Sequence, residues 1–136
     1  MAYFLPLLLP FPYLVNRFFW GNGSVAGNMD VGVYTRGGKL IASTGAIAQT
    51  PASDLQYAAP SGGAFYLDPG EYLLAISNNG TANRGWGTTT LTNLEARMIG
   101  IYSMASAHAL PATATLAIQA NSIWPAVGIT RTTTGF

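Results

Sequence analysis

The chain contains no cysteine and a single histidine, His108. The absence of cysteine excludes a disulfide framework and a thiolate metal site. One histidine leaves a histidine-based metal cluster or a Ser–His–Asp triad with a single candidate ligand or base. The side chains on which many metalloproteins and hydrolases depend are therefore scarce in this sequence.

Charged residues are also scarce, at 8% of the 136 residues against roughly 25% in ordinary soluble domains. The net charge of +1 and the pI of about 8.1 give no electrostatic reason to expect binding to nucleic acid or to an anionic membrane. Serine, threonine, asparagine and glycine could supply the polarity of a monomer, or much of the surface could be buried against other subunits. We favour the second interpretation and expect a permanent homo-oligomer.

No apolar run continues far without interruption. The first twenty residues, MAYFLPLLLPFPYLVNRFFW, are strongly apolar but contain three prolines, which interrupt any helix. Arg17 occurs before about twenty apolar residues have accumulated, and no basic stretch precedes the run, so neither a membrane anchor nor a signal peptide is predicted. We predict instead that residues 1–12 form an extended arm that lies on its own domain or on a neighbouring subunit. The predicted assembly interface consists of the apolar side chains of this arm, namely Tyr3, Phe4, Leu5, Leu7, Leu8, Leu9 and Phe11.

The strongest strand signals lie in two stretches. Residues 29–34 alternate with the two-residue period of a half-buried strand, and residues 39–43 return after Gly37 and Gly38. A Gly–Gly pair between two such runs predicts a hairpin with a primed turn, because primed turns need positive φ angles. Residues 71–77 form a nearly continuous apolar run, which predicts a central strand covered on both faces.

Weaker signals organise the rest of the chain. Thr92 and Glu95 have the spacing of a capping box, which predicts one helical turn followed by a strand that ends at Met104. Glycine, proline and asparagine turns separate seven to nine short strands, and this pattern is typical of an antiparallel sandwich. We therefore predict an all-β, jelly-roll-like sandwich in which residues 13–136 form a single domain. Further strands are predicted at 13–20, 55–57, 64–67, 113–119 and 126–131.

Candidate catalytic groups are few. Asp30 and Glu71 lie in the two best strands, and a glycosidase would need two such carboxyl groups about 5–10 Å apart. The simpler interpretation is that Asp30 accepts structural hydrogen bonds and that Glu71 is exposed at the end of a strand. Ser103, Ser106 and His108 are close in sequence, but nothing around them resembles a nucleophile elbow. We predict no catalytic residue and no enzymatic activity.

Candidate ligand-binding groups are likewise limited. The chain lacks the closely spaced aspartates of a calcium loop, so no metal and no cofactor are predicted. Trp86, between two glycines, is the best candidate for an exposed aromatic ring that contacts a ligand, with Asn79 and Asn83 as neighbours. Packing of Trp86 into the core and turn formation by the two asparagines are the alternatives.

A set of glycines and strand residues resembles a β-sandwich module of tailed-bacteriophage virion proteins, including decoration, head-fibre and tail-fibre chains. The resemblance spans most of the chain, and its motifs mainly determine the fold. The matching residues are Val15-x-Arg17-x-x-Trp20-x-Asn22-Gly23, Gly27-Asn28-Met29-Asp30-Val31-Gly32-Val33-Tyr34, Gly38-x-x-Leu40, Ser43-x-Gly45, Leu67-x-Pro69-Gly70-x-Tyr72-x-Leu74-Ala75, Leu110-Pro111-Ala112-Thr113 and Pro125-x-x-Gly128-Ile129-x-x-Arg131.

This resemblance implies a virion structural protein that is made in the host cytoplasm and has no enzymatic activity. Phage fibres usually carry a long N-terminal attachment region, whereas here only a short apolar arm precedes the module. The leading hypothesis is therefore a capsid decoration or cement protein, bound to the major capsid protein as a homo-oligomer, with a trimer favoured. The alternative is a tail-fibre or tail-tip subunit that binds host surface glycans.

Overall fold

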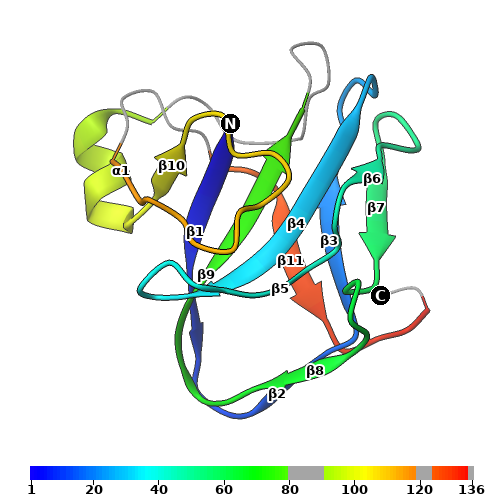
Figure 1. Ribbon diagram of the computed structural model, residues 1–136, viewed down its shortest axis with the longest axis horizontal. Coiled ribbons are helices and arrows are strands. Elements are labelled where there is room, and N and C mark those ends of the chain that lie inside the picture. Colours follow the sequence, from blue (N-terminus) through cyan, green and yellow to red (C-terminus); the bar gives the residue numbers. More distant parts are fainter. Residues whose placement is uncertain (80–90, 119–123, 135–136) are drawn as a thin grey trace.

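A computed structural model describes residues 1–79, 91–118 and 124–134. Their strands pair in antiparallel sheets that pack against one another, so the predicted all-β sandwich is confirmed (Figure 1). Eleven strands and one helix occur in these residues: β1 (Ala2–Leu9), β2 (Tyr13–Val15), β3 (Arg17–Gly21), β4 (Asn28–Thr35), β5 (Leu40–Ser43), β6 (Ile47–Ala48), β7 (Leu55–Ala58), β8 (Phe65–Leu67), β9 (Gly70–Asn78), α1 (Asn93–Ile99), β10 (Tyr102–Met104) and β11 (Val127–Thr130).

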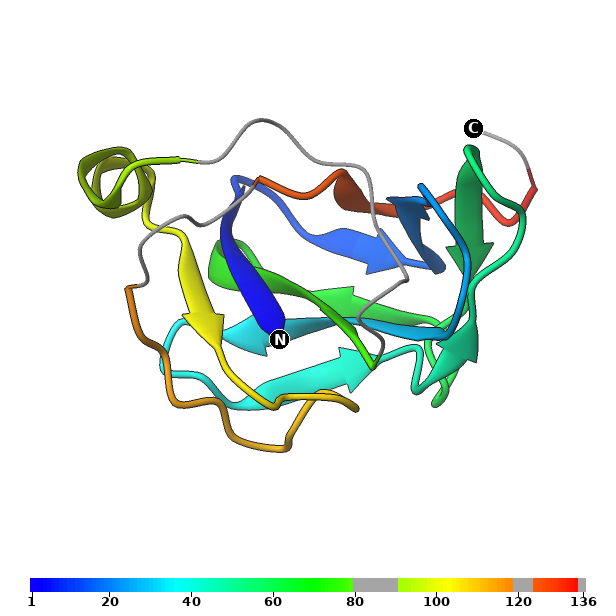
Figure 2. The same cartoon turned by 90° about the horizontal axis from the view of Figure 1, so that it is seen from above.

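The strands form two main layers with the hydrophobic core between them. The larger sheet has the order β10-β1-β9-β4-β5, with β6 also paired to β4, and the smaller sheet has the order β11-β3-β7. Figure 2 shows β3 and β11 on one side of β9 and β4. Phe18 and Trp20 of the smaller sheet are buried with Val31 and Ile76 of the larger one. Burial of these side chains is the main favourable term that holds the layers together.

One long ribbon links the two layers. Residues 2–21 run antiparallel to residues 55–78, first as β1 with β9, then as β2 with β8, and finally as β3 with β7. The ribbon bends between Leu9 and Tyr13 on one strand and between Leu67 and Gly70 on the other, where it leaves the larger sheet (Figure 1). The ribbon therefore contributes strands to both layers of the antiparallel sandwich.

The first strand corrects the predicted boundary at residue 12. The segment is extended, as expected, but Ala2–Leu9 is paired with β9 along its whole length and belongs to the domain. Pro6 does not prevent this pairing. The pairing of β10 with β1 ends at Phe4, so at Pro6 the strand β1 has only β9 as a neighbour. A strand tolerates proline where no partner needs its missing N–H.

The β4–β5 hairpin is confirmed, but its turn is not the predicted primed turn. The Gly38 N–H donates to the Thr35 carbonyl at 3.0 Å, and of the two glycines only Gly38 has a positive φ, at 87°. This is the three-residue hairpin loop in which a left-handed residue follows an ordinary turn. Further along the hairpin, Val33 pairs with Ala42 and Tyr34 with Leu40, so Ile41 forms a bulge in β5.

Other local predictions hold in part. The capping box of Thr92 and Glu95 is confirmed, but the helix continues to Ile99, and the strand that follows has only three residues. The strand expected over 13–20 is divided at Asn16 into β2 and β3. The central position of β9, between β1 and β4, is confirmed. No helix within the described residues is long and apolar enough to cross a membrane.

Residues 105–118 form a strap, in place of the strand expected over 113–119. The strap lies on the face of the larger sheet that points away from the smaller one (Figure 2). It makes single bridges, from Thr113 to Lys39 and from Ala117 to Ser103, so no continuous ladder forms over 113–118. A second hydrophobic core is buried between the strap and the larger sheet. It explains why β9 carries apolar side chains on both of its faces. The buried members of this second core are Ala2, Phe4, Tyr34, Leu73, Ala75, Ala107, Leu110 and Ala114.

Candidate functional site

Asp30 is the one carboxylate in the described residues that is fully buried, with 1% of its surface exposed. Its Oδ2 accepts a hydrogen bond of 2.9 Å from the backbone N–H of Leu110, and the Thr44 hydroxyl donates to Oδ1 at 3.2 Å. A buried carboxylate needs such donors, because the loss of water would otherwise be costly. The predicted role of Asp30 as a structural hydrogen-bond acceptor is therefore confirmed.

Ser77 and His108 lie beside this carboxylate without forming a catalytic triad. Ser77 pairs with Asp30 across β9 and β4, and its Oγ lies 3.1 Å from Nδ1 of His108. In a triad the histidine bridges serine and aspartate, whereas Asp30 bonds to Leu110 and Thr44. Ser77 is also only 1% exposed, which leaves no space for a substrate at its hydroxyl.

The two serines that are close to His108 in sequence, Ser103 and Ser106, do not form a shared site with it. Ser103 is buried in β10, where its backbone pairs with Ala117, and Ser106 is exposed in the strap. The residue that meets His108 is Ser77, which comes from a distant strand. Only the pairing of β9 with β4 beneath the strap brings this serine to the histidine, and the local sequence carries no sign of it.

Tyr34 completes the polar contacts beneath the strap. Its hydroxyl donates to the Pro111 carbonyl at 2.6 Å. Burial, together with the negative charge of Asp30, raises the pKa of Tyr34 well above the ordinary value of 10.0, so the phenol stays protonated. The polar side chains of the sheet thus meet residues 108–111 of the strap and hold it against the second core.

The carboxylate pair considered for glycosidase chemistry is far apart. Asp30 pairs with Ser77, and Glu71 lies six residues from Ser77 along the same strand, which is a separation of about 20 Å. Glu71 is exposed and lies 3.6 Å from the Arg36 guanidinium. This arrangement does not fit two carboxylates across a sugar. No group of three metal-ligating side chains occurs in the part of the chain that the structure describes.

The predicted interface residues of the N-terminal segment divide between core and surface. Phe4, Leu5 and Leu9 are buried within the same chain, so they cannot contact a neighbouring subunit without unfolding. Tyr3 and Leu7 are half-buried against the main core. The exposed members are Leu8 and Phe11, which are 70% and 55% accessible to solvent.

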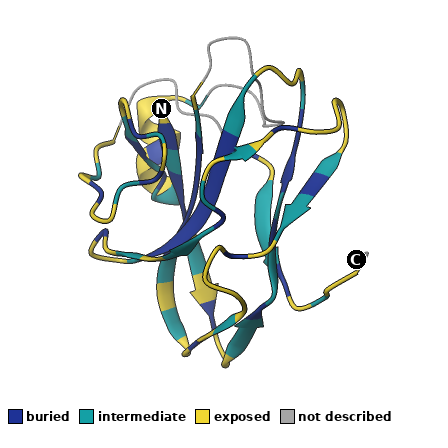
Figure 3. Ribbon diagram, turned by 45° about the vertical axis from the view of Figure 1, so that its right-hand side comes forward, coloured by how far each residue is buried: buried dark blue, intermediate teal, exposed yellow. Residues whose placement is uncertain are grey.

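Tyr66 joins these two residues at the bend of the ribbon and is 73% exposed. It pairs with Leu14 across β8 and β2, on the outward side of the ribbon, as Leu8 is on β1. We call Leu8, Phe11 and Tyr66 the tip; Figure 3 shows exposed stretches at this end of the molecule. Tyr66 was not predicted as an interface residue, although its alternation with Phe65 and Leu67 in a short strand was a signal that it faces outward.

The outward face of the smaller sheet carries a second group of aromatic side chains. The rings of Phe19 and Tyr57 lie 6.1 Å apart between centroids, and the Arg17 guanidinium lies 4.7 Å above the Tyr57 ring. Gly128 pairs with Phe19, and a Cβ at this glycine would be 2.3 Å from the ring. The glycine therefore lets the Phe19 ring lie over the neighbouring strand.

The ligand contacts predicted around Trp86 can be placed only in part. Trp86 and Asn83 lie outside the described residues. Asn79 is exposed, and its side-chain oxygen accepts a hydrogen bond of 2.9 Å from the backbone N–H of Asn28. This contact joins the ends of β9 and β4, which gives Asn79 a structural contact between two strands.

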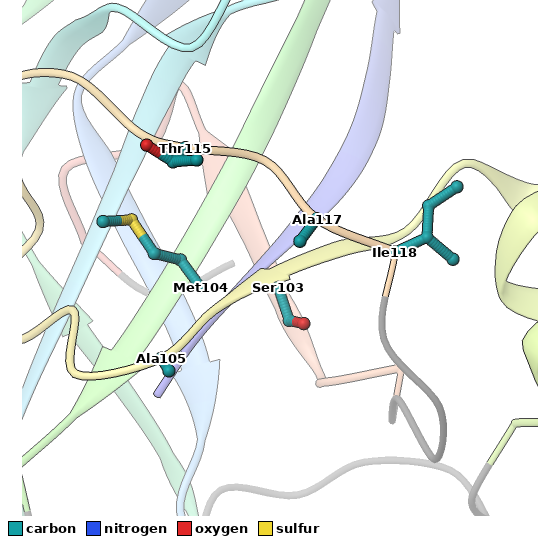
Figure 4. A pocket seen from close by; sticks show the side chains of 6 residues that line it. All are labelled: Ser103, Met104, Ala105, Thr115, Ala117 and Ile118. Carbon is teal, nitrogen blue, oxygen red and sulfur yellow. The ribbon is translucent and has the colours of Figure 1, made fainter.

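A hollow of about 330 Å³ opens between β10 and the second half of the strap (Figure 4). Its walls are mainly apolar, and none of the described residues that line it has a titratable side chain. The lining residues are Ser103, Met104, Ala105, Thr115, Ala117 and Ile118.

No protein-family model, curated protein or solved structure matches this chain.

Proposed function

We propose that this chain is a non-enzymatic structural subunit of a tailed-bacteriophage particle, a decoration protein that assembles through its tip. The observation that carries the proposal is the tip itself, where Leu8, Phe11 and Tyr66 are all more than half exposed. Three large apolar side chains at one end of a domain are typical of a protein contact surface. The resemblance to virion modules supports the particle as the place of assembly.

The polar groups of the described residues support a structural role. Asp30 and Tyr34 make their hydrogen bonds to the strap, and the hydroxyl of Ser77 is buried against His108. Groups that are committed to internal contacts hold the fold and are not free to act on a substrate. The low charge of the sequence, 8%, supports a surface that is partly covered by other subunits.

The proposal is tested by the occupancy of purified particles. A variant with Leu8→Ser, Phe11→Ser and Tyr66→Ser keeps the core intact, because all three side chains are exposed. We expect this variant to fall to less than about a tenth of the wild-type copy number, since burial of three large apolar side chains contributes several kcal/mol to binding. Quantitative mass spectrometry of particles grown with either protein measures the copy number.

A matched control removes exposed apolar side chains elsewhere. Leu94 and Met98 lie on the outward side of α1 and are as exposed as the tip residues. The variant with Leu94→Ser and Met98→Ser should keep its wild-type occupancy. Wild-type occupancy of the tip variant, or equal loss of both variants, would contradict assembly through the tip.

A second candidate function is a tail subunit that binds host glycans, and the observation that favours it is the aromatic face of the smaller sheet. Aromatic rings provide flat apolar surfaces on which a sugar ring can stack. Phe19 and Tyr57 offer two such rings. The Arg17 guanidinium covers one face of the Tyr57 ring and donates to the carbonyl and hydroxyl of Thr132, so the candidate rests on the rings. Under this function, Tyr57→Ala abolishes adsorption to host cells while particle assembly is unaffected. Unchanged adsorption by particles that carry Tyr57→Ala would remove the candidate.

A further inference from the structure

The two sides of the tip carry opposite charges. Arg131 follows β11, which lies beside β2, as the hydrogen bond from the Asn16 N–H to the Thr130 carbonyl shows. Asp68 follows β8, which pairs with β2 on its other edge through Tyr13 and Leu67. The segment 11–13 therefore runs between a guanidinium on one side and a carboxylate on the other.

The guanidinium of Arg131 is held in place against the aromatic rings of the tip region. It lies 4.6 Å from the ring centroid of Tyr13 and 5.9 Å from that of Phe11, and it donates to the Pro12 carbonyl at 3.0 Å. Arg131 remains exposed, and a guanidinium has five donors, of which this contact uses one. It is thus pre-oriented at the edge of an apolar surface, where a partner carboxylate can reach it.

Asp68 has a complementary environment. The residue is exposed in the turn between β8 and β9, and no salt bridge to it is formed by any residue in 1–79, 91–118 or 124–134. The nearby Arg36 and Glu71 are exposed and lie 3.6 Å from each other, so together they add no net charge to the patch. The charges left to a partner of the tip are therefore one positive group and one negative group, on opposite sides.

We propose that the tip binds the tip of a second copy of this chain about a two-fold axis. A two-fold contact brings the same surface of both copies together, so each charge meets the residue on the other side of the patch. Arg131 of each copy then faces Asp68 of the other, and the apolar side chains of the two tips pack between these pairs. A patch of a single sign would repel its own copy, whereas this patch is complementary to itself.

The two-fold contact rests on the proposed function, because both use the tip as the assembly contact. It adds that the partner of the tip is a second copy of this chain. Three side chains and a narrow polar rim make a contact at the small end of protein interfaces. We therefore expect a reversible dimer with a dissociation constant of about 10–100 μM. Sedimentation velocity of the purified full chain, from about 1 μM to about 1 mM, measures it.

Charge exchange tests the arrangement directly. Arg131→Asp and Asp68→Arg, each alone, should weaken the dimer about tenfold or more, because each places like charges across the axis. The variant that combines both substitutions restores opposite charges in exchanged positions and should return to within about threefold of the wild-type affinity. Asp54→Arg, an exposed site outside the tip, should leave the affinity unchanged, and thermal unfolding of every variant verifies the fold.

Several outcomes overturn the two-fold contact: a wild-type chain that stays monomeric, a wild-type trimer, or a double variant as weak as the single ones. If the wild type is monomeric and the serine tip variant is lost from particles, the tip binds a partner other than a second copy. That result would contradict the two-fold contact and support the proposed function. A dimer that follows the charge pattern, with full particle occupancy of the tip variant, would support the dimer and contradict assembly on the particle through the tip.

Discussion

The carboxylate of Asp30 is hydrogen-bonded to the backbone N–H of Leu110, eighty residues further along the chain, at 2.9 Å. This single contact joins the most recognisable strand of the sequence to a segment without strand periodicity. It agrees with the structural interpretation of Asp30 that the sequence favoured over the catalytic one, because the carboxylate is occupied beneath the strap.

Loss of this carboxylate should destabilise the whole domain. Asp30→Ala leaves the buried Leu110 N–H without its acceptor and removes one of the two acceptors within reach of the Thr44 hydroxyl, so we expect the free energy of unfolding to fall by about 2–3 kcal/mol. Asp54, which is exposed and accepts a local bond from the Leu55 N–H, provides the control. Asp54→Ala should change the stability by less than about 0.5 kcal/mol in urea denaturation. Equal effects of the two substitutions would exclude a special role for Asp30.

Two adjacent glycines should respond differently to a methyl group. Gly38 has a φ of 87°, and a Cβ there would lie 2.7 Å from the Ala114 carbonyl oxygen in the strap. Gly38→Ala should therefore cost about 2 kcal/mol. At Gly37 the nearest atom to a Cβ is 3.9 Å away, so Gly37→Ala should be close to neutral. Chemical denaturation of both variants checks the difference, and a neutral Gly38→Ala would contradict the close approach of the strap.

The pairing of β1 within the larger sheet predicts effects of very different size at two apolar residues of this strand. Phe4 is fully buried and its ring lies 5.2 Å from that of Tyr34, so Phe4→Ala should cost about 3–5 kcal/mol. Leu8 is 70% exposed on the same strand, and Leu8→Ala should cost less than about 0.5 kcal/mol in the monomer. Thermal unfolding at low protein concentration measures both. A free N-terminal arm would instead make Phe4→Ala harmless.

Alkaline pH should destabilise the protein through its buried tyrosine. Because the pKa of Tyr34 is raised in the folded state, the folded chain keeps a proton that the unfolded chain loses near pH 10. The stability is thus complete below that pH and falls as the pH rises above it. Tyr34→Phe should lower stability by about 1–2 kcal/mol at neutral pH and flatten the alkaline decline. Tyr66→Phe, at an exposed ring, should leave the decline unchanged, and an unaltered decline in Tyr34→Phe would reject the assignment.

Local sequence signals predicted those parts of the fold in which neighbouring residues decide the structure. The strand over 29–34, the apolar run over 71–77 and the capping box of Thr92 and Glu95 appear in β4, β9 and α1. The alternation over 29–34 predicted a half-buried strand, whereas β4 is buried on both faces because the second core covers its other side. In each case the pattern is repeated over several residues, or the hydrogen bonds join residues three positions apart. Such information is contained within one window of the sequence.

The parts that the sequence could not predict depend on distant partners. Pro6 is compatible with β1 only because β10 is too short to reach it, and nothing near Pro6 indicates the length of β10. The strap shows no periodicity because single residues such as Leu110 and Pro111 meet individual side chains of the sheet. Tyr66 is a tip residue because the ribbon bends beside it, and only the pairing of β2 with β8 shows the bend.

The pairing of residues 2–21 with residues 55–78 also governs how the chain reaches its folded state. The ribbon cannot close until strands far apart in the sequence meet, and proteins dominated by such pairings fold in milliseconds to seconds. Until β9 docks, β1 presents an apolar strand with unpaired backbone groups, which other chains can capture. The yield of refolding should therefore decrease as the protein concentration rises. A strand that is paired along its whole length in the finished sandwich is thus open to misassembly on the way to it.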